Sequence, residues 1–298
     1  MRNNDKPSID LIRDWWNSHS YSYGINSSND DYLDTGIPKN FTKPELFSEY
    51  ERKYRKHLTE ASDSLGRIAG RFIPYDWIAD KSVLDVACGL GWATVSMAES
   101  GARVESIDLT PKAVEFTKEY LNSRGLNAKV SEMSAENLHF PDNHFDFVLG
   151  WGFIMHTENP ELALKEMIRV TRSGGKIVLY FYYKHSISYW WNIIILRGIL
   201  LGYLLRFRMN TTKLVSRFTD GITVGGNSKT LVLSRTWFKA NALSEKALEI
   251  KFIGWGPPSL LDSFPIRRIP LGKFLPGKFK EIWSRQFGFG HICIIDIH

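Results

Sequence analysis

The segment DVACGLGW, Asp85–Trp92, holds the first residues whose types and spacing suit chemistry. Gly89 and Gly91 stand beside the small Ala87, where a β-branched run gives way to a helical pattern. Small residues let the backbone approach a ligand closely, and the N–H groups that begin a helix are free to bind it. Asp108 ends the next β-branched run, where a carboxylate can accept both hydroxyls of a ribose. Together they predict a site for a nucleoside-containing cofactor, although Asp108 taken alone would also suit a turn.

Further segments continue this pattern along the chain. They are Asp85–Gly91, Asp108, SAENLHFPDNHFD at 134–146, GFIMHTENP at 152–160 and RVTRSGGKIVLY at 169–180. Taken together they resemble the class I S-adenosylmethionine-dependent methyltransferases, and most closely the small-molecule branch of that family. The resemblance is dense over residues 80 to 182 and looser through the C-terminal part. A dinucleotide loop, G-x-G-x-x-G, fits less well, because its third small position would be Thr94.

The resemblance implies S-adenosylmethionine as the cofactor and a place for each part of it. The loop Asp85–Gly91 would cradle the methionine part, and Asp108 would hold the ribose diol. Leu109 and the segment 134–136 would line the adenine pocket, and the end of the fourth predicted strand would lie beside the methionine part. The matching positions are Asp85, Ala87, Cys88, Gly89, Gly91, Asp108, Leu109, Ser134, Ala135, Glu136, Trp151 and Gly152.

Two departures from the family pattern affect this site. The family usually has glycine at the position of Ala87 and often an acid at that of Ser134, so the loop is narrower and the adenine contact weaker here.

In relatives the segment before the first strand is a lid, and Tyr21 or Tyr23 would close on the carboxylate of the cofactor. The alternative is that the aromatic residues of this leader only fix it to the core.

His156, in GFIMHTENP, is the candidate for a catalytic base. Methyl transfer from a sulfonium needs alignment and exclusion of water, and a base only where the acceptor arrives protonated. Histidine titrates near working pH, and many relatives place one here facing the substrate; packing in the loop is the alternative. Tyr183 and His185, at the end of the fifth predicted strand, are a reserve orienting group and a reserve base. No ligand cluster at metal spacing and no nucleophile motif occurs, so no metal site is predicted.

The elements that must position these residues begin at Ser82, from which short β-branched runs alternate with amphipathic segments. This pattern predicts an α/β fold: a doubly wound, mostly parallel seven-stranded sheet with an N-terminal helical lid and an α-helical insertion. A charged helix is also expected near Lys43 to Arg71. The predicted strands lie at 82–87, 103–108, 128–133, 145–151, 174–182, 247–256 and 290–298.

Two regions outside the alternation divide the chain into four segments. Residues 1–75 are expected to form a lid over the substrate, 76–182 the S-adenosylmethionine-binding core, 183–230 an apolar and basic cap insertion, and 231–298 the C-terminal part of the sheet.

The net charge of +6 gathers in two stretches, Lys184–Asp220 and Arg267–Arg285, each with six basic residues and one acid. Such stretches are commonly solvated faces, and they also suit a phosphate-bearing or membrane-surface partner. No aromatic–basic motif of a nucleic-acid module occurs, so no nucleic-acid partner is expected. Two cysteines, and the lack of an apolar signal core in the first thirty residues, predict a reducing cytoplasm without a disulfide framework.

The stretch Tyr189–Phe207, YWWNIIILRGILLGYLLRF, is nearly long enough to cross a bilayer as a helix. A span there would separate the fifth predicted strand from the sixth and seventh, which argues against it. Three roles remain: closing the substrate cleft, packing against the leader or a second subunit in a homodimer, and resting on a membrane surface. We favour the first, which predicts that serine at Ile194 and Leu201 weakens acceptor turnover and spares cofactor binding.

The function predicted from these features is a cytoplasmic methyltransferase that acts on a largely apolar small molecule at oxygen, nitrogen or carbon. One alternative is an enzyme that is peripheral to the membrane and acts on a sugar, glycan or lipid-linked intermediate. Another alternative, from a different class, is a non-catalytic binding or scaffolding subunit with the same fold.

Overall fold

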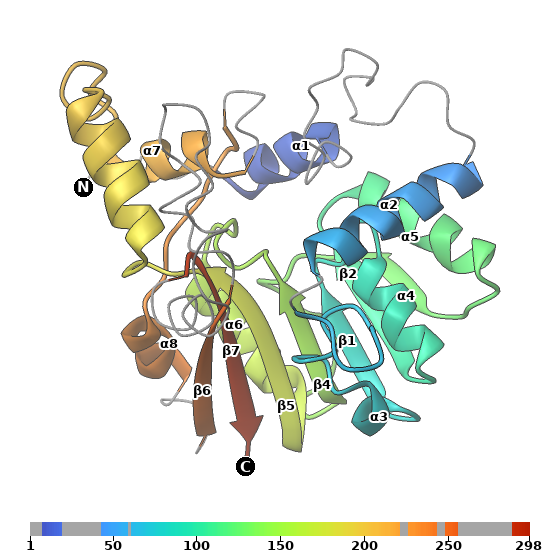
Figure 1. Cartoon of the computed structure of the whole chain (residues 1–298). Helices are drawn as coiled ribbons and strands as arrows, with labels where there is room; N and C mark the ends of the chain where they lie inside the picture. Colours follow the sequence, from blue (N-terminus) through green and yellow to red (C-terminus); the bar gives the residue numbers. More distant parts are fainter. Residues whose placement is uncertain (1–7, 20–42, 59–60, 221–225, 243–247, 256–287) are drawn as a thin grey trace.

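A seven-stranded sheet runs through the part of the chain that the computed structural model describes, residues 8–19, 43–58, 61–220, 226–242, 248–255 and 288–298 (Figure 1). Its order is β3-β2-β1-β4-β5-β7-β6, with β7 antiparallel to both of its neighbours and the other neighbouring pairs parallel. The predicted fold class is thereby confirmed. The strands are β1 (Ser82–Val86), β2 (Arg103–Asp108), β3 (Lys129–Glu132), β4 (Phe145–Trp151), β5 (Thr171–Tyr182), β6 (Leu248–Trp255) and β7 (Gly290–Ile297).

Successive residues of the central strands enter two separate cores, because side chains alternate between the faces of a sheet. On β1, Val83 packs with residues of α3, α4 and α5, whereas Leu84 packs on the opposite face with residues of α6 and α8. Both side chains are fully buried. Helices therefore cover both faces, as parallel strands require. These helices are α3 (Tyr75–Ile78), α4 (Trp92–Glu99), α5 (Pro111–Ser123), α6 (Pro160–Val170) and α8 (Arg235–Ala242).

The charged helix of the leader, α2 (Lys43–His57), is shorter than the predicted helix that reached Arg71. The carboxylate of Asp63 accepts a hydrogen bond from the Arg67 backbone N–H at 3.0 Å, and Gly66 has a φ of +72°. Side-chain bonds of this kind compete with the helical ladder, and a positive φ favours glycine in a turn. The chain therefore turns after α2 instead of continuing the helix.

The apolar stretch forms a π-helix, η3 (Ser188–Leu200), and not a single helix that continues to Phe207. Gly198 carries no side chain where Leu204 folds back onto it, since an added Cβ would lie 2.8 Å from Leu204 Cδ1. Gly202 follows with a φ of +76°, which suits the turn that ends the helix. No helix within the described residues is both long and apolar enough to cross a membrane.

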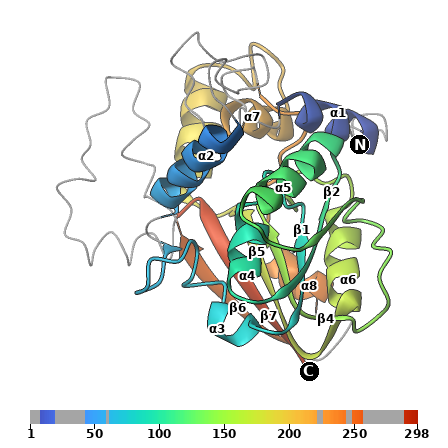
Figure 2. The ribbon, with the colours of Figure 1, turned by 90° about the vertical axis from the view of Figure 1, so that its right-hand side faces the viewer.

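Helix α1 (Ile9–His19) lies with η3 and α7 (Thr211–Phe218) above the carboxyl ends of the parallel strands (Figures 1 and 2). The Ile9 N–H donates to Glu158 Oε2 at 2.9 Å, so a carboxylate holds the first turn of α1. η3 and α7 share a small core of their own. This layer covers the sheet edge at which ligands bind in parallel α/β folds.

Candidate active site

A cavity of about 480 Å³ lies at the carboxyl ends of β1, β2, β4 and β5, and α1 contributes to its wall. This volume is typical of a small-molecule site. The other walls come from α2, from the loops that follow the first four strands, and from two residues far along the chain, Asp220 and Phe289. The site therefore depends on segments that are distant in sequence.

The loop after β1 has the backbone of a ligand cradle. Ala87, Gly89 and Gly91 have φ values of 58°, 56° and 82°, all in the left-handed region. No atom lies within 4 Å of a Cβ built on Gly89, so this side of the loop is open to a ligand. At Gly91 an added Cβ would lie 2.8 Å from the side chain of Thr117, because here α5 packs closely on the loop. The loop thus fits a cofactor that lies against bare backbone.

Asp108 ties the second strand to this loop. Its Oδ2 accepts the Gly89 N–H at 2.9 Å, and its Oδ1 accepts the N–H and the hydroxyl of Thr110 at 2.9 and 2.8 Å. Burial raises the pKa of Asp108, although these hydrogen bonds oppose the rise. Asp108 also lines the cavity, where its carboxylate can accept a ligand hydroxyl.

Asp85 anchors the cradle from within the protein. The side chain is 2% exposed, and the Thr94 hydroxyl donates to its Oδ2 at 2.7 Å. Ser106 Oγ lies 2.9 Å from the same hydroxyl, so the carboxylate joins β1 to α4 and β2. Burial raises the pKa of Asp85 to about 7.

The predicted adenine end is held together by its own polar groups. The Glu136 N–H donates to Ser134 Oγ at 3.2 Å, which closes a turn. The carboxylate of Glu136 accepts the Glu158 N–H at 2.8 Å and the Asn159 side-chain amide at 3.1 Å. Glu136 therefore joins the loop after β3 to the loop after β4, and both loops line the cavity.

Aromatic side chains form a continuous wall of the cavity, from α2 to the strand edge beyond β5. Each ring contacts the next, and the Trp151 and Tyr180 rings are stacked. The sequence of contacts, with the distance between ring centroids, is Tyr54–Trp92 at 5.7 Å, Trp92–Trp151 at 5.5 Å, Trp151–Tyr180 at 5.3 Å, Tyr180–Tyr182 at 6.0 Å and Tyr182–Phe289 at 4.4 Å. Such a wall favours apolar ligands and positively charged groups, which aromatic faces attract.

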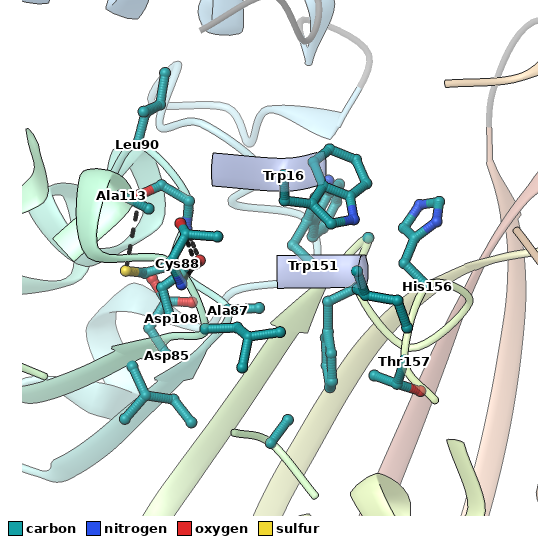
Figure 3. A pocket seen from close by; sticks show the side chains of 18 of the residues that line it. Trp16, Asp85, Ala87, Cys88, Leu90, Asp108, Ala113, Trp151, His156 and Thr157 are labelled. Atoms are coloured by element: carbon teal, nitrogen blue, oxygen red, sulfur yellow. Dashed lines mark hydrogen bonds between the residues drawn. The ribbon is translucent and has the colours of Figure 1, made fainter. Parts of the chain in front are cut away.

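His156 lies across the cavity from Asp85 and Asp108, with Trp16 of α1 between them (Figure 3). Its side chain is buried, and its Nδ1 lies 2.8 Å from the Lys229 carbonyl oxygen, so Nδ1 carries a proton and donates it. Its Nε2 lies 3.1 Å from Asp220 Oδ2.

Asp220 is itself held in place, since the Tyr182 hydroxyl donates to its Oδ1 at 2.7 Å. The buried Lys229 ammonium donates to the carbonyl oxygens of Thr157 and Glu158 at 2.8 and 2.7 Å, which fixes the loop that carries His156. A histidine, a carboxylate and a phenol thus lie together at the end of the cavity opposite the cradle.

The structure brings most of the predicted site residues together. Gly91 is set back against α5, Tyr183 packs on His291 with ring centroids 4.0 Å apart, and His185 is exposed; none of these three lines the cavity. Tyr21 and Tyr23 lie outside the described residues. The predicted residues that line the cavity are Asp85, Ala87, Cys88, Gly89, Asp108, Leu109, Ser134, Ala135, Glu136, Trp151, Gly152 and His156.

Several cavity residues were not predicted from the sequence, among them Trp16, Tyr50, Tyr54 and Asp220. A signal existed for two of them. Trp16 belongs to the aromatic leader WWNSHSYSYG, and Asp220 is the single acid at the end of a stretch with six basic residues. The two tyrosines of α2 stand in an ordinary charged helix, which gave no such signal.

Comparison with known proteins places the cradle and Asp108 within a recognised domain. A family model described as a methyltransferase domain matches residues 84–179. A demethylmenaquinone methyltransferase from Geobacillus sp. (strain WCH70) is 30% identical over 143 residues, which are 45% of this chain and 58% of that protein. A norajmaline N-methyltransferase from Rauvolfia serpentina is 35% identical over 111 residues, which are 36% of this chain and 38% of that protein. The matches thus span between 38% and 58% of these relatives.

The crystal structure of geranyl diphosphate C-methyltransferase from Streptomyces coelicolor A3(2), in complex with Mg2+, geranyl diphosphate and S-adenosyl-L-homocysteine, has a similar fold. Its TM-score is 0.55 at 14% identity, with 98% of both chains covered. At this identity the likeness concerns the fold alone. The family match covers nearly all of β1 to β5, so residues 84–179 match a methyltransferase domain, and the chain has the fold of the class I methyltransferases.

Proposed function

We propose that this protein transfers the methyl group of S-adenosylmethionine to a small, largely apolar acceptor that presents an O–H or N–H group. One observation carries the proposal. A single cavity has the glycine cradle and Asp108 at one end, the His156–Asp220 pair at the other, and an aromatic wall between them. The first end suits a nucleoside cofactor, and the second suits removal of a proton.

S-adenosylmethionine supplies a methyl group on a positively charged sulfur. Asp108 and the bare backbone at Gly89 would hold the cofactor, and the faces of Trp92 and Trp151 would stabilise its positive charge and exclude water. The acceptor would lie against Tyr180 and the wall beyond it. Alignment of the acceptor with the methyl group is then the main contribution of the protein.

His156 would take the proton of the acceptor at Nε2, because Nδ1 is committed to the Lys229 carbonyl oxygen. The Asp220 carboxylate, 3.1 Å from Nε2, would stabilise the positive charge that the ring acquires. The Tyr182 hydroxyl holds the carboxylate in this position. This arrangement supports transfer to oxygen or nitrogen, where a proton must leave.

Isothermal titration with S-adenosylhomocysteine tests the cofactor assignment. Asp108→Asn should weaken binding at least about tenfold, because hydrogen bonds to charged groups contribute about 1.5–3 kcal/mol. Glu115→Gln, on the exposed side of α5, removes one carboxylate elsewhere and should leave binding unchanged. The proposal fails if the folded protein does not bind the ligand, or if both variants bind as tightly as the wild type.

A further inference from the structure

Seven of the ten large apolar side chains that are exposed in the described part of the chain lie between residues 190 and 207. Leu200 is 67% exposed and Leu205 is 76% exposed. Soluble surfaces rarely gather so many large apolar side chains in one short segment. We call this set the apolar tip; it comprises Trp190, Trp191, Ile199, Leu200, Leu201, Leu205 and Phe207.

The apolar tip is not the packing face of η3. The packing face consists of buried residues such as Ile193 and Ile194, which contact Leu214 and Val215 of α7. No residue of η3, all of which the structure describes, lines the cavity. Within the part of the chain that the structure describes, the exposed side chains of the tip are thus separate from both the contact with α7 and the cavity.

The charges beside the tip are positive. The segment Lys184–Asp220 contains six basic residues and one acid. That acid, Asp220, is 7% exposed and is engaged in the cavity, so the segment shows no acidic group to its surroundings. The basic residues next to the tip that reach solvent are Arg206, Arg208 and Lys213.

We propose that the apolar tip and its basic neighbours bind the surface of an anionic lipid bilayer. Apolar side chains enter the boundary between head groups and acyl chains, while arginine and lysine pair with anionic head groups. A second copy of the chain fits less well, because a twofold contact would place the same basic residues against each other.

The tip lies in the layer formed by η3, α7 and α1, at the end of the sheet that holds the cavity (Figures 1 and 2). From the tip the chain passes through α7 and reaches Asp220 in the cavity wall. A bilayer bound there would lie near the site, and an apolar acceptor dissolved in it would have a short path to the aromatic wall. This delivery rests on the proposed function, whereas lipid binding does not.

Sedimentation with vesicles tests the binding. The full chain should bind vesicles of phosphatidylcholine mixed with phosphatidylglycerol, bind phosphatidylcholine alone more weakly, and lose binding at high salt. Leu200→Ser with Leu201→Ser should reduce binding at least about tenfold, since each removes most of an exposed leucine from the lipid. Leu65→Ser with Leu162→Ser, two exposed leucines elsewhere, is the matched control and should bind as the wild type does.

Charge reversal gives an independent test. Arg206→Glu with Arg208→Glu should reduce binding to the anionic vesicles at least about tenfold, whereas Arg103→Glu with Lys118→Glu, on exposed positions of β2 and α5, should change it far less. Titration of the same samples with S-adenosylhomocysteine tests the cofactor site separately. Every variant should bind this ligand as the wild type does. Absence of vesicle binding, equal loss in the control variants, or a dimer that the tip substitutions dissolve would overturn the proposal and leave the proposed function standing.

Discussion

Asp85 is a buried carboxyl group whose protonation should affect the stability of the fold. Burial raises its pKa to about 7, whereas an exposed aspartate has a pKa near 4. Between these values the folded state holds a proton that the unfolded state has lost, so this residue lowers the free energy of unfolding as pH rises. The contribution should be lost from about pH 4 to about pH 7 and stay constant above.

Asp85→Asn should remove this pH dependence, because asparagine is neutral at every pH and can still accept the Thr94 hydroxyl. The difference in the free energy of unfolding between variant and wild type should change by up to about 1.4 kcal/mol per pH unit in this range. Urea unfolding at several pH values measures it. A difference that stays constant from pH 4 to 7 would show that the carboxyl group titrates normally.

The second prediction for single residues concerns the His156–Asp220 pair. His156→Gln should lower the rate of transfer to a weakly acidic phenol about 10²-fold or more, because the imidazole that accepts the proton is then missing. Asp220→Asn should lower it less, since the imidazole remains. Titration calorimetry with S-adenosylhomocysteine checks that both variants retain the cofactor site.

A series of phenols of increasing acidity separates catalysis from packing. A phenol that is already ionised at the assay pH needs no base, so wild type and His156→Gln should methylate it at similar rates. An equal loss for all phenols would instead assign His156 a structural role.

Individual residues could be predicted from sequence where local geometry fixes their role. Gly89 and Asp108 belong to a strand-to-helix turn and a strand end, so their neighbours in sequence already indicate the site. Asp220 could not be placed in this way, because it meets His156 only through the path of the chain after β5. The hydrogen bond from the loop after β4 to the carboxylate of Glu136 is a tertiary contact of the same kind, which the sequence alone does not indicate.

At the scale of elements, α1 should control how long the cofactor stays bound. It contributes Ile9, Ile12 and Trp16 to the cavity, and Glu158 holds its first turn. Glu158→Ala removes that bond, which is worth about 1 kcal/mol, so S-adenosylhomocysteine should dissociate about fivefold faster. Stopped-flow tryptophan fluorescence measures the rate. Glu161→Ala, in the first turn of α6, is the control and should leave it unchanged; equal rates in all three proteins would mean that α1 does not restrain the ligand.

The strands were predictable because each is a short β-branched run between turn signals, and all seven predicted strands occur. The end of the helix in the apolar stretch was not predictable, because hydrophobicity does not specify where a helix ends. Contact between Leu204 and the bare backbone of Gly198 ends η3 early, and that is a matter of close packing. The length of α2 was overestimated for a similar reason, since Asp63 binds backbone N–H groups that a continuing helix would use.

At the scale of the whole molecule, the cavity joins parts of the chain that the family match does not cover. Residues 84–179 supply the cradle and the loop that carries His156. The leader supplies α1 and α2, and the part after β5 supplies Asp220 and Phe289. Specificity for an acceptor should therefore reside outside the recognised domain.

A ligand that contacts all these parts should stabilise them together. At a concentration of S-adenosylhomocysteine one hundred times its dissociation constant, the free energy of unfolding should rise by about 2.7 kcal/mol and the melting temperature by roughly 4 °C. Hydrogen exchange should then slow in α1 and α2 as well as in the loop Asp85–Gly91, because the cavity wall includes both helices. Asp108→Asn should reduce both effects in parallel. Protection confined to residues 84–179 would show that the leader is not part of the cofactor site.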